Sequence, residues 1–176
     1  MAGVSLITVA GIHAYPAGPP PGVTGGFGED TCVKCHNSFE LNAGRAMGLG
    51  DLTVSGLPQQ YQPGQTYEVK VEHTHTKDRN VWGFQLAARV KGSGEQAGEL
   101  KPIDDHTQVL SEKGIQYVEH TADGTFSNVF QFNWMAPGSS VGDIVVSVAG
   151  NAADGDASAV GDYIYSTSIT MPAASH

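Results

Sequence analysis

The residues of this chain that are best suited to do chemistry are its two cysteines, which lie three positions apart. They occur in the string Cys32-Val33-Lys34-Cys35-His36, and the 176-residue chain has no other cysteine. A C-x-x-C-H string is the attachment motif of haem c, because two thiols at this spacing reach the two vinyl groups of one porphyrin. The adjoining histidine then lies beneath the iron as an axial ligand. The sequence therefore predicts one covalent haem c on Cys32 and Cys35, with His36 as the proximal ligand.

Three other interpretations of the cysteine pair stay open. A thioredoxin-like redox pair opens a helix after a βα unit, and no such unit is visible upstream. A structural zinc site needs four ligands, and the chain has no second cysteine pair. A short-loop disulfide would join the same two thiols. The histidine that directly follows Cys35 favours haem c over all three.

The ligand on the far side of the iron decides the chemistry. A second protein ligand closes the site for electron transfer, whereas an open position admits small molecules. We expect His120 as this distal ligand, with His75 or His73 as alternatives. His73 and His75 continue an apolar strand face that starts at Tyr67, where an imidazole needs a partner or a metal. For each histidine the competing interpretation is a structural or solvated ring. The other residues weighed as ligands are weaker: His13, His106, His176, Met47 and Met135.

Alternating apolar and polar residues predict β-strands as the elements that position these groups. Strands are expected at 67–75, 81–90, 126–134, 141–149 and 163–171, with shorter ones at 52–54, 109–110 and 116–120. The only helix expected is a short one near 32–47, around the haem motif. Strands at such regular spacing, separated by turn residues, predict an all-β antiparallel sandwich of two sheets.

The chain divides into four segments. Residues 1–14 are apolar and end at a plausible cleavage point, so they are interpreted as a signal-peptide remnant, although the positive n-region is missing. A buried strand is the alternative. Residues 15–50 combine a Pro- and Gly-rich linker with the haem attachment segment, 51–172 form the sandwich domain, and 173–176 are a tail. Because haem c is attached outside the cytoplasm, we expect a periplasmic, secreted or cell-surface protein.

Composition excludes several classes of function. The net charge of −9 opposes binding to nucleic acid, and no apolar run reaches the roughly 18 residues of a transmembrane helix. Charged residues are 15% of the chain, against about 25% in typical domains, while 23 glycines supply turns. The acidity predicts weak docking on a basic redox partner. The alternative is that it only keeps an exported domain soluble.

An acidic loop near the C-terminus raises the question of calcium. Its oxygen ligands are Asn151, Asp154, Asp156 and Asp162, in a loop that contains glycine. Alternating oxygen ligands can hold Ca²⁺, but the closing Glu of an EF-hand is missing, and Asx turns explain the same residues. Calcium is therefore the less favoured interpretation. Asp104-Asp105-His106 has no nucleophile elbow beside it and is interpreted as a solvated loop.

Several strings together carry a family resemblance. These are 82–86 (WGFQL), 117–121 (YVEHT), 132–137 (FNWMAP), and 149–156 running into 161–167. They resemble the bacterial reeler-like proteins, often called choice-of-anchor V domains, some of which carry an N-terminal C-x-x-C-H. The resemblance covers about 32–171 and implies an Ig-like β-sandwich in an exported protein. The family commonly ends in an anchor, whereas this sequence ends at Ala173-Ala174-Ser175-His176, which favours secretion or periplasmic residence.

Together these patterns predict an exported monohaem c-type cytochrome domain on a β-sandwich, serving electron transfer. The alternative is an extracellular binding or adhesion module whose haem is structural or missing. A peroxidase-like enzyme would need an open distal site and an acid–base group, for which only the same histidines are available. An electron carrier or binding protein is therefore favoured over an enzyme.

Overall fold

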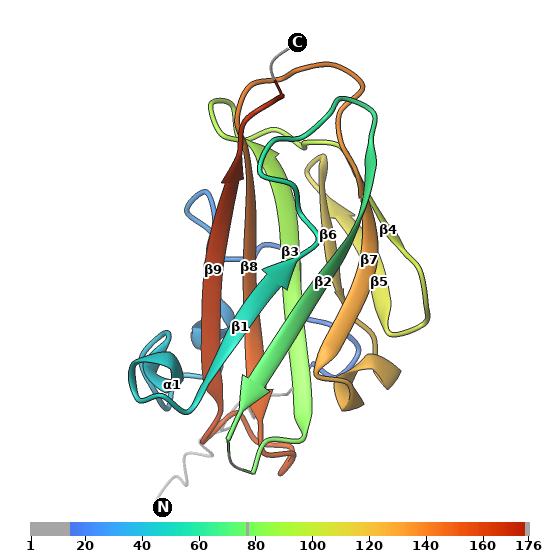
Figure 1. Cartoon of the computed structure of the whole chain (residues 1–176). Coiled ribbons are helices and arrows are strands. Elements are labelled where there is room, and N and C mark those ends of the chain that lie inside the picture. The colour runs from blue at the N-terminus through green and yellow to red at the C-terminus, as the bar shows by residue number, and fades with distance from the viewer. Residues whose placement is uncertain (1–14, 77, 175–176) are drawn as a thin grey trace, which may run out of the picture.

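The computed structural model describes residues 15–76 and 78–174, so the segment interpreted as a signal-peptide remnant lies outside the described residues. The strands are β1 (Gly50–Ser55), β2 (Thr66–His75), β3 (Val81–Val90), β4 (Glu99–Pro102), β5 (Thr107–Glu112), β6 (Ile115–His120), β7 (Val129–Met135), β8 (Ile144–Ala153) and β9 (Tyr163–Met171). They form a four-stranded sheet, β1-β2-β7-β4, and a five-stranded sheet, β5-β6-β3-β8-β9 (Figure 1). All pairs within the two sheets are antiparallel. The expected two-sheet sandwich is confirmed.

Most expected strands are present, but several bounds differ. The strand expected at 141–149 is β8, which runs from Ile144 to Ala153. The strands expected at 81–90 and 163–171 have these bounds in β3 and β9. The strand expected from 126 starts only at Val129, because Asp123–Phe126 forms a 3-10 helix (η2) that leaves Phe126 79% exposed. The short edge strand β4 was not expected. It has four residues and ends in a proline, so its sequence carries little alternation.

The core lies between the two sheets. Each sheet contributes buried aromatic and aliphatic side chains to it, including Val69, Val71, Phe130, Phe132 and Trp134 from one sheet and Phe84, Leu86, Val146 and Val148 from the other. Each fully buried side chain of this size stabilises the fold by about 1.5–3 kcal/mol. The indole of Trp134 donates its hydrogen bond to the carbonyl of Ala97 at 2.9 Å, so the core leaves this polar group satisfied.

Residues 15–49 pack against the five-stranded sheet. They contain a 3-10 helix, η1 (Cys32–Lys34), and one turn of α-helix, α1 (Ala43–Ala46). None of the helices in the described ranges is long and apolar enough to cross a membrane. Val23 and Thr24 are buried, so the segment interpreted as a linker is part of the folded domain.

The side chain of Gln85 fixes this N-terminal segment. Gln85 alternates on β3 with Phe84 and Leu86, whose side chains enter the core, so it points to the outer face of the sheet. Its oxygen accepts hydrogen bonds from the backbone N–H groups of Gly22 and Val23 at 3.0 and 2.9 Å. Its amide nitrogen donates to the carbonyl of Pro20 at 3.1 Å. One side chain therefore satisfies three backbone groups of a segment without regular structure.

Glu119 completes this attachment. Its two carboxylate oxygens accept from the amide of Gln85 at 2.8 Å and from the amide of Gln108 at 3.1 Å. Gln108 in turn donates to the carbonyl of Ala17 at 2.5 Å. The side chain of Glu119 is fully buried, and burial raises its pKa from 4.5 to about 7 although both hydrogen bonds lower it. The ionised carboxylate is therefore destabilised in the folded chain.

This burial predicts a pH-dependent stability. Between pH 4.5 and 7 the unfolded chain releases the proton of Glu119 while the folded chain keeps it, so folding weakens as pH rises. Relative to Glu119→Gln, the wild type should lose about 2–3 kcal/mol of unfolding free energy between pH 5 and pH 8. Urea unfolding of both proteins at several pH values measures the difference. Glu112→Gln, at an exposed position on the neighbouring strand, is the control and should show a constant offset. A constant offset for Glu119→Gln as well would contradict the prediction.

Candidate functional site

The C-x-x-C-H string folds into one tight turn. The side chain of Thr31 accepts a hydrogen bond from the N–H of Val33 and caps η1. The N–H groups of Cys35 and His36 both donate to the carbonyl of Cys32, at 3.2 and 2.9 Å. Cys32 and Cys35 are free thiols, so the short-loop disulfide is not formed. The turn brings both thiols and the imidazole to the wall of one cavity.

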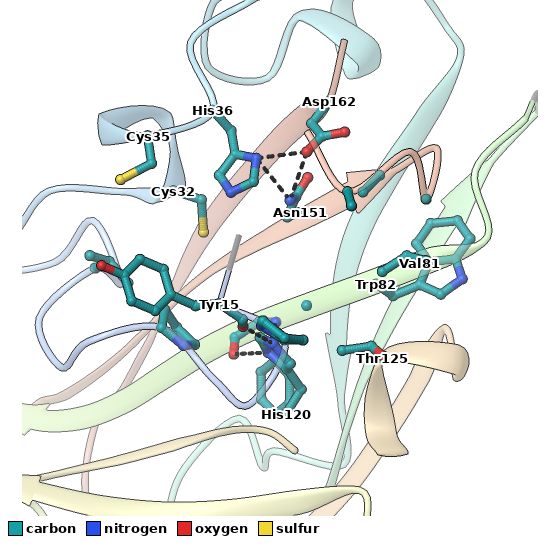
Figure 2. Close-up of a pocket in the computed structure, with 18 of the residues that line it drawn as sticks. Tyr15, Cys32, Cys35, His36, Val81, Trp82, His120, Thr125, Asn151 and Asp162 are labelled. Carbon is teal, nitrogen blue, oxygen red and sulfur yellow. Dashed lines mark hydrogen bonds and ion pairs between the residues drawn. The ribbon is translucent and has the colours of Figure 1, made fainter. Parts of the chain in front are cut away.

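This cavity has a volume of about 560 Å³ and lies between the N-terminal segment and the sandwich (Figure 2). The motif lines one side, and the rest is lined by the N-terminal segment before it, the start of β3, η2, the loop after β8 and His120. Much of the wall is apolar, with contributions from Pro19, Pro20, Val23, Val81, Trp82 and Phe84. A volume between roughly 300 and 1,000 Å³ is typical of sites for small ligands and cofactors.

His36 is oriented by a buried carboxylate. Its Nδ1 lies 2.6 Å from Oδ2 of Asp162, and the amide of Asn151 donates to the same oxygen at 3.2 Å (Figure 2). Asp162 is only 1% exposed, and its carboxylate, the shortest contact of the ring, favours the imidazole proton on Nδ1, although the amide nitrogen of Asn151 lies 3.3 Å from the same atom. Nε2 then keeps its lone pair, and this is the form of histidine that binds a metal.

His120 lines the same cavity as the motif. Its Nδ1 accepts from the N–H of Phe84 at 3.1 Å, and its Nε2 lies 3.4 Å from the carbonyl of Tyr15. The ring packs on Gly83, where an added Cβ would lie 2.8 Å from Cε1, so glycine makes room for the imidazole. Burial lowers the pKa of His120, and the ring is neutral at pH 7.

The other two histidines expected near iron lie elsewhere. His73 sits in the core, where its Nε2 donates to the carbonyl of Gly83 at 3.1 Å and burial lowers its pKa to about 3. His75 is half-buried, with its ring centroid 5.0 Å from that of Tyr163. Neither lines the cavity of the motif. Of the three histidines, the fold brings His120 together with Cys32, Cys35 and His36.

The protonation of Cys32 bears on the redox-pair interpretation. Burial raises the pKa of the Cys32 thiol to about 12, so the group is a neutral thiol at pH 7. Thiols of disulfide oxidoreductases have lowered pKa values, because the thiolate is the nucleophile. The environment of Cys32 is therefore opposite to that of a thioredoxin-like site.

The acidic loop forms the Asx turns expected from the sequence. Asp154 accepts from the N–H of Asp156 at 3.2 Å, and Asp156 accepts from the N–H of Ser158 at 2.7 Å. Across residues 15–76 and 78–174, no three His, Cys, Asp or Glu side chains converge as ligands of a metal ion. Asp104 accepts from the N–H of His106 in an exposed loop.

Sequence reasoning placed Asp162 and Asn151 only in the acidic loop and did not connect them with His36. Asn151 lies on β8 and Asp162 directly precedes β9. The pairing of these strands sets Asn151 opposite Ile164, and this brings both polar side chains to one end of the sheet. The sequence did offer a signal that these two residues lie close together, because they flank the loop of one expected hairpin.

The comparisons with known proteins concern the sandwich. No curated protein matches the chain. The crystal structure of the human F-spondin reeler domain is 22% identical, with a TM-score of 0.53, and the match covers 71% of this chain and 88% of that chain. The Reelin-N domain of F-spondin is 23% identical, with a TM-score of 0.53 and coverage of 72% and 86%. At these identities the likeness shows the fold alone.

A family model described as Reeler domain matches residues 46–150, which is more than half of the chain. The matched range includes His120 and begins after the C-x-x-C-H string. The chain belongs to the Reeler domain family.

Proposed function

We propose that this chain is an exported monohaem c-type cytochrome domain that transfers electrons. The observation that carries the proposal is the composition of one cavity wall. Two free thiols, a metal-competent imidazole and a second neutral imidazole all line an apolar cavity of about 560 Å³. Haem c requires this combination of groups: two thiols, a proximal histidine and an apolar enclosure.

The residues of the site have separate roles in this function. The thiols of Cys32 and Cys35 would hold the porphyrin through two thioether bonds. The Nε2 of His36 would bind the iron. When bound, haem c supplies a one-electron ferric/ferrous couple. The prolines and Trp82 would give the haem an apolar wall.

His120 is the distal ligand in this proposal. Binding through Nε2 requires the imidazole proton on Nδ1, where the carbonyl of Phe84 lies 3.3 Å away and can accept it. In the present tautomer the same Nδ1 accepts from the N–H of Phe84 at 3.1 Å. The backbone of Phe84 can therefore hydrogen-bond Nδ1 in either tautomer of His120. Ligation of the iron would break the contact between Nε2 and the carbonyl of Tyr15.

The proposed location is extracytoplasmic, because haem c is attached outside the cytoplasm. Membership of the Reeler domain family supports it. The proposed partner is a basic redox protein, since the net charge of −9 attracts a cationic surface.

A second candidate function is an extracellular binding module with structural haem or none. The exposure of Phe126 favours it, because this aromatic ring is 79% exposed and lines the same cavity. Exposed aromatic side chains are common at sites that bind other molecules.

Covalent haem is the first prediction of the proposal. Co-expression with a haem c maturation system should add the mass of one haem, and the pyridine haemochrome spectrum should report two thioether bonds. The double variant Cys32→Ala, Cys35→Ala should keep the unmodified mass, because the attachment groups are gone. His106→Ala, in an exposed loop, is the control and should carry haem. If the wild type keeps its unmodified mass, the cytochrome proposal is contradicted and the extracellular binding module becomes the favoured function.

Distal ligation by His120 is tested by spectroscopy. The ferric wild type should show a six-coordinate, low-spin spectrum at neutral pH, because two imidazoles bind the iron. His120→Ala should convert most of the haem to high spin, whereas His106→Ala should leave the spectrum unchanged. High-spin ferric haem in the wild type would contradict ligation of the iron by His120.

Electrostatic docking predicts a salt-dependent rate. The Debye length falls from about 30 Å at 0.01 M to about 8 Å at 0.15 M ionic strength, so attraction between exposed charges is screened. Electron exchange with a cationic protein donor, followed by stopped flow, should slow several-fold over this range. A small neutral donor serves as the control, and equal salt dependence for both donors would argue against steering by charge.

A further inference from the structure

The carboxylate beside His36 has an unusual environment. Asp162 is 1% exposed, its Oδ2 accepts from His36 and Asn151, and its Oδ1 has no hydrogen-bond partner among the described residues. A buried carboxylate is costly unless charges or several hydrogen bonds compensate it. Both hydrogen bonds fall on Oδ2, so the imidazole of His36 is the nearest partner of this buried carboxylate.

The neighbouring cation does not neutralise this carboxylate. Arg79 donates to the carbonyl of Gly161 at 2.8 Å, and its guanidinium lies 3.9 Å from Asp154. Its guanidinium carbon also lies 5.2 Å from the ring centroid of Tyr163. The shortest contact of the Asp162 carboxylate is with His36, whose ring is 14% exposed.

We infer that Asp162 is the positioning residue of the proximal histidine and that its charge lowers the reduction potential of the haem. The inference rests on the proposed function. A carboxylate on Nδ1 fixes the tautomer and the orientation of a ligating histidine and makes it a stronger electron donor. The ferric site carries one more positive charge than the ferrous site, so a nearby carboxylate stabilises the ferric state. The domain is then suited to reduce acceptors of higher potential.

Asn151 supports Asp162 in this role. Its side-chain amide donates to Oδ2, the oxygen that accepts from His36, and this holds the carboxylate in place. Asn151 lies within β8, and Asp162 lies directly before β9. The pairing of β8 with β9 therefore sets the position of Asn151 relative to Asp162.

The test compares two neutralising substitutions in one loop. Asp162→Asn removes the charge next to His36 and keeps an oxygen that can accept from Nδ1. Asp156→Asn removes an equal charge from an exposed position of the same loop and keeps the Asx turn. In spectroelectrochemical titrations, Asp162→Asn should favour the ferrous state about tenfold over the wild type, a shift of about 59 mV for one electron. Asp156→Asn should shift the potential much less, and equal shifts would overturn the inference.

Two further measurements separate the inference from the proposed function. In the chain before haem attachment, ¹⁵N NMR should find the His36 proton on Nδ1, and Asp162→Ala should lose this preference. Absence of the preference in the wild type overturns the positioning role, whatever the haem content. If Asp162→Asn fails to fold, Asn151→Ala is used, and an unchanged potential in that variant overturns the inference. Failure of the wild type to take up haem overturns the proposed function instead, while the NMR result still decides the positioning role.

Discussion

The candidate site depends on the hydrogen bonds of one buried amide. Gln85 holds the backbone of Pro20, Gly22 and Val23 against the outer face of the five-stranded sheet, and Glu119 and Gln108 extend this contact. The segment offers no strand to pair with the sheet, so side-chain contacts hold it there, and the ion pair of Glu29 with Arg89 adds to those of Gln85. With them it becomes a wall of the cavity, and the C-x-x-C-H turn is brought opposite His120.

Much of the sandwich could be predicted from alternation, and the exceptions have physical causes. In β2 a buried face alternates with a more exposed one, whereas β9 is buried on both faces at its start, and the expected bounds of both strands agree with the structure to within a residue. The predicted start of the strand at 126 was wrong, because Phe126 continues the apolar pattern of Phe130 and Phe132 but lies in the 3-10 helix η2. The edge strand β4 has too few residues to show any period. Alternation of apolar and polar residues indicates a strand only where one face is buried, and burial depends on how the two sheets pack.

Some residues of the candidate site are neighbours in the sequence, and others are far apart. The C-x-x-C-H turn is local, since five consecutive residues contain both thiols and the imidazole, and their spacing was enough to expect them side by side. Haem attachment at this turn stays a prediction. The partner of His36 is 126 residues away, and no spacing rule connects the two. Among three candidate histidines, the sequence ranked His120 first, but only the packing on Gly83 and the tether to Phe84 show why it reaches the cavity. His73 has a similar sequence context and lies in the core instead.

The large separation between His36 and Asp162 also has a consequence for biosynthesis. The chain is made from its N-terminus, so the cysteine-containing turn emerges well before the strands that enclose it. Contacts between residues so far apart in the sequence form late in folding, because the long intervening loop must first close. During that interval the two thiols are more accessible than in the folded chain, where both cysteines are partly buried. The attachment step that the proposed function requires would therefore be easiest before the cavity wall is assembled.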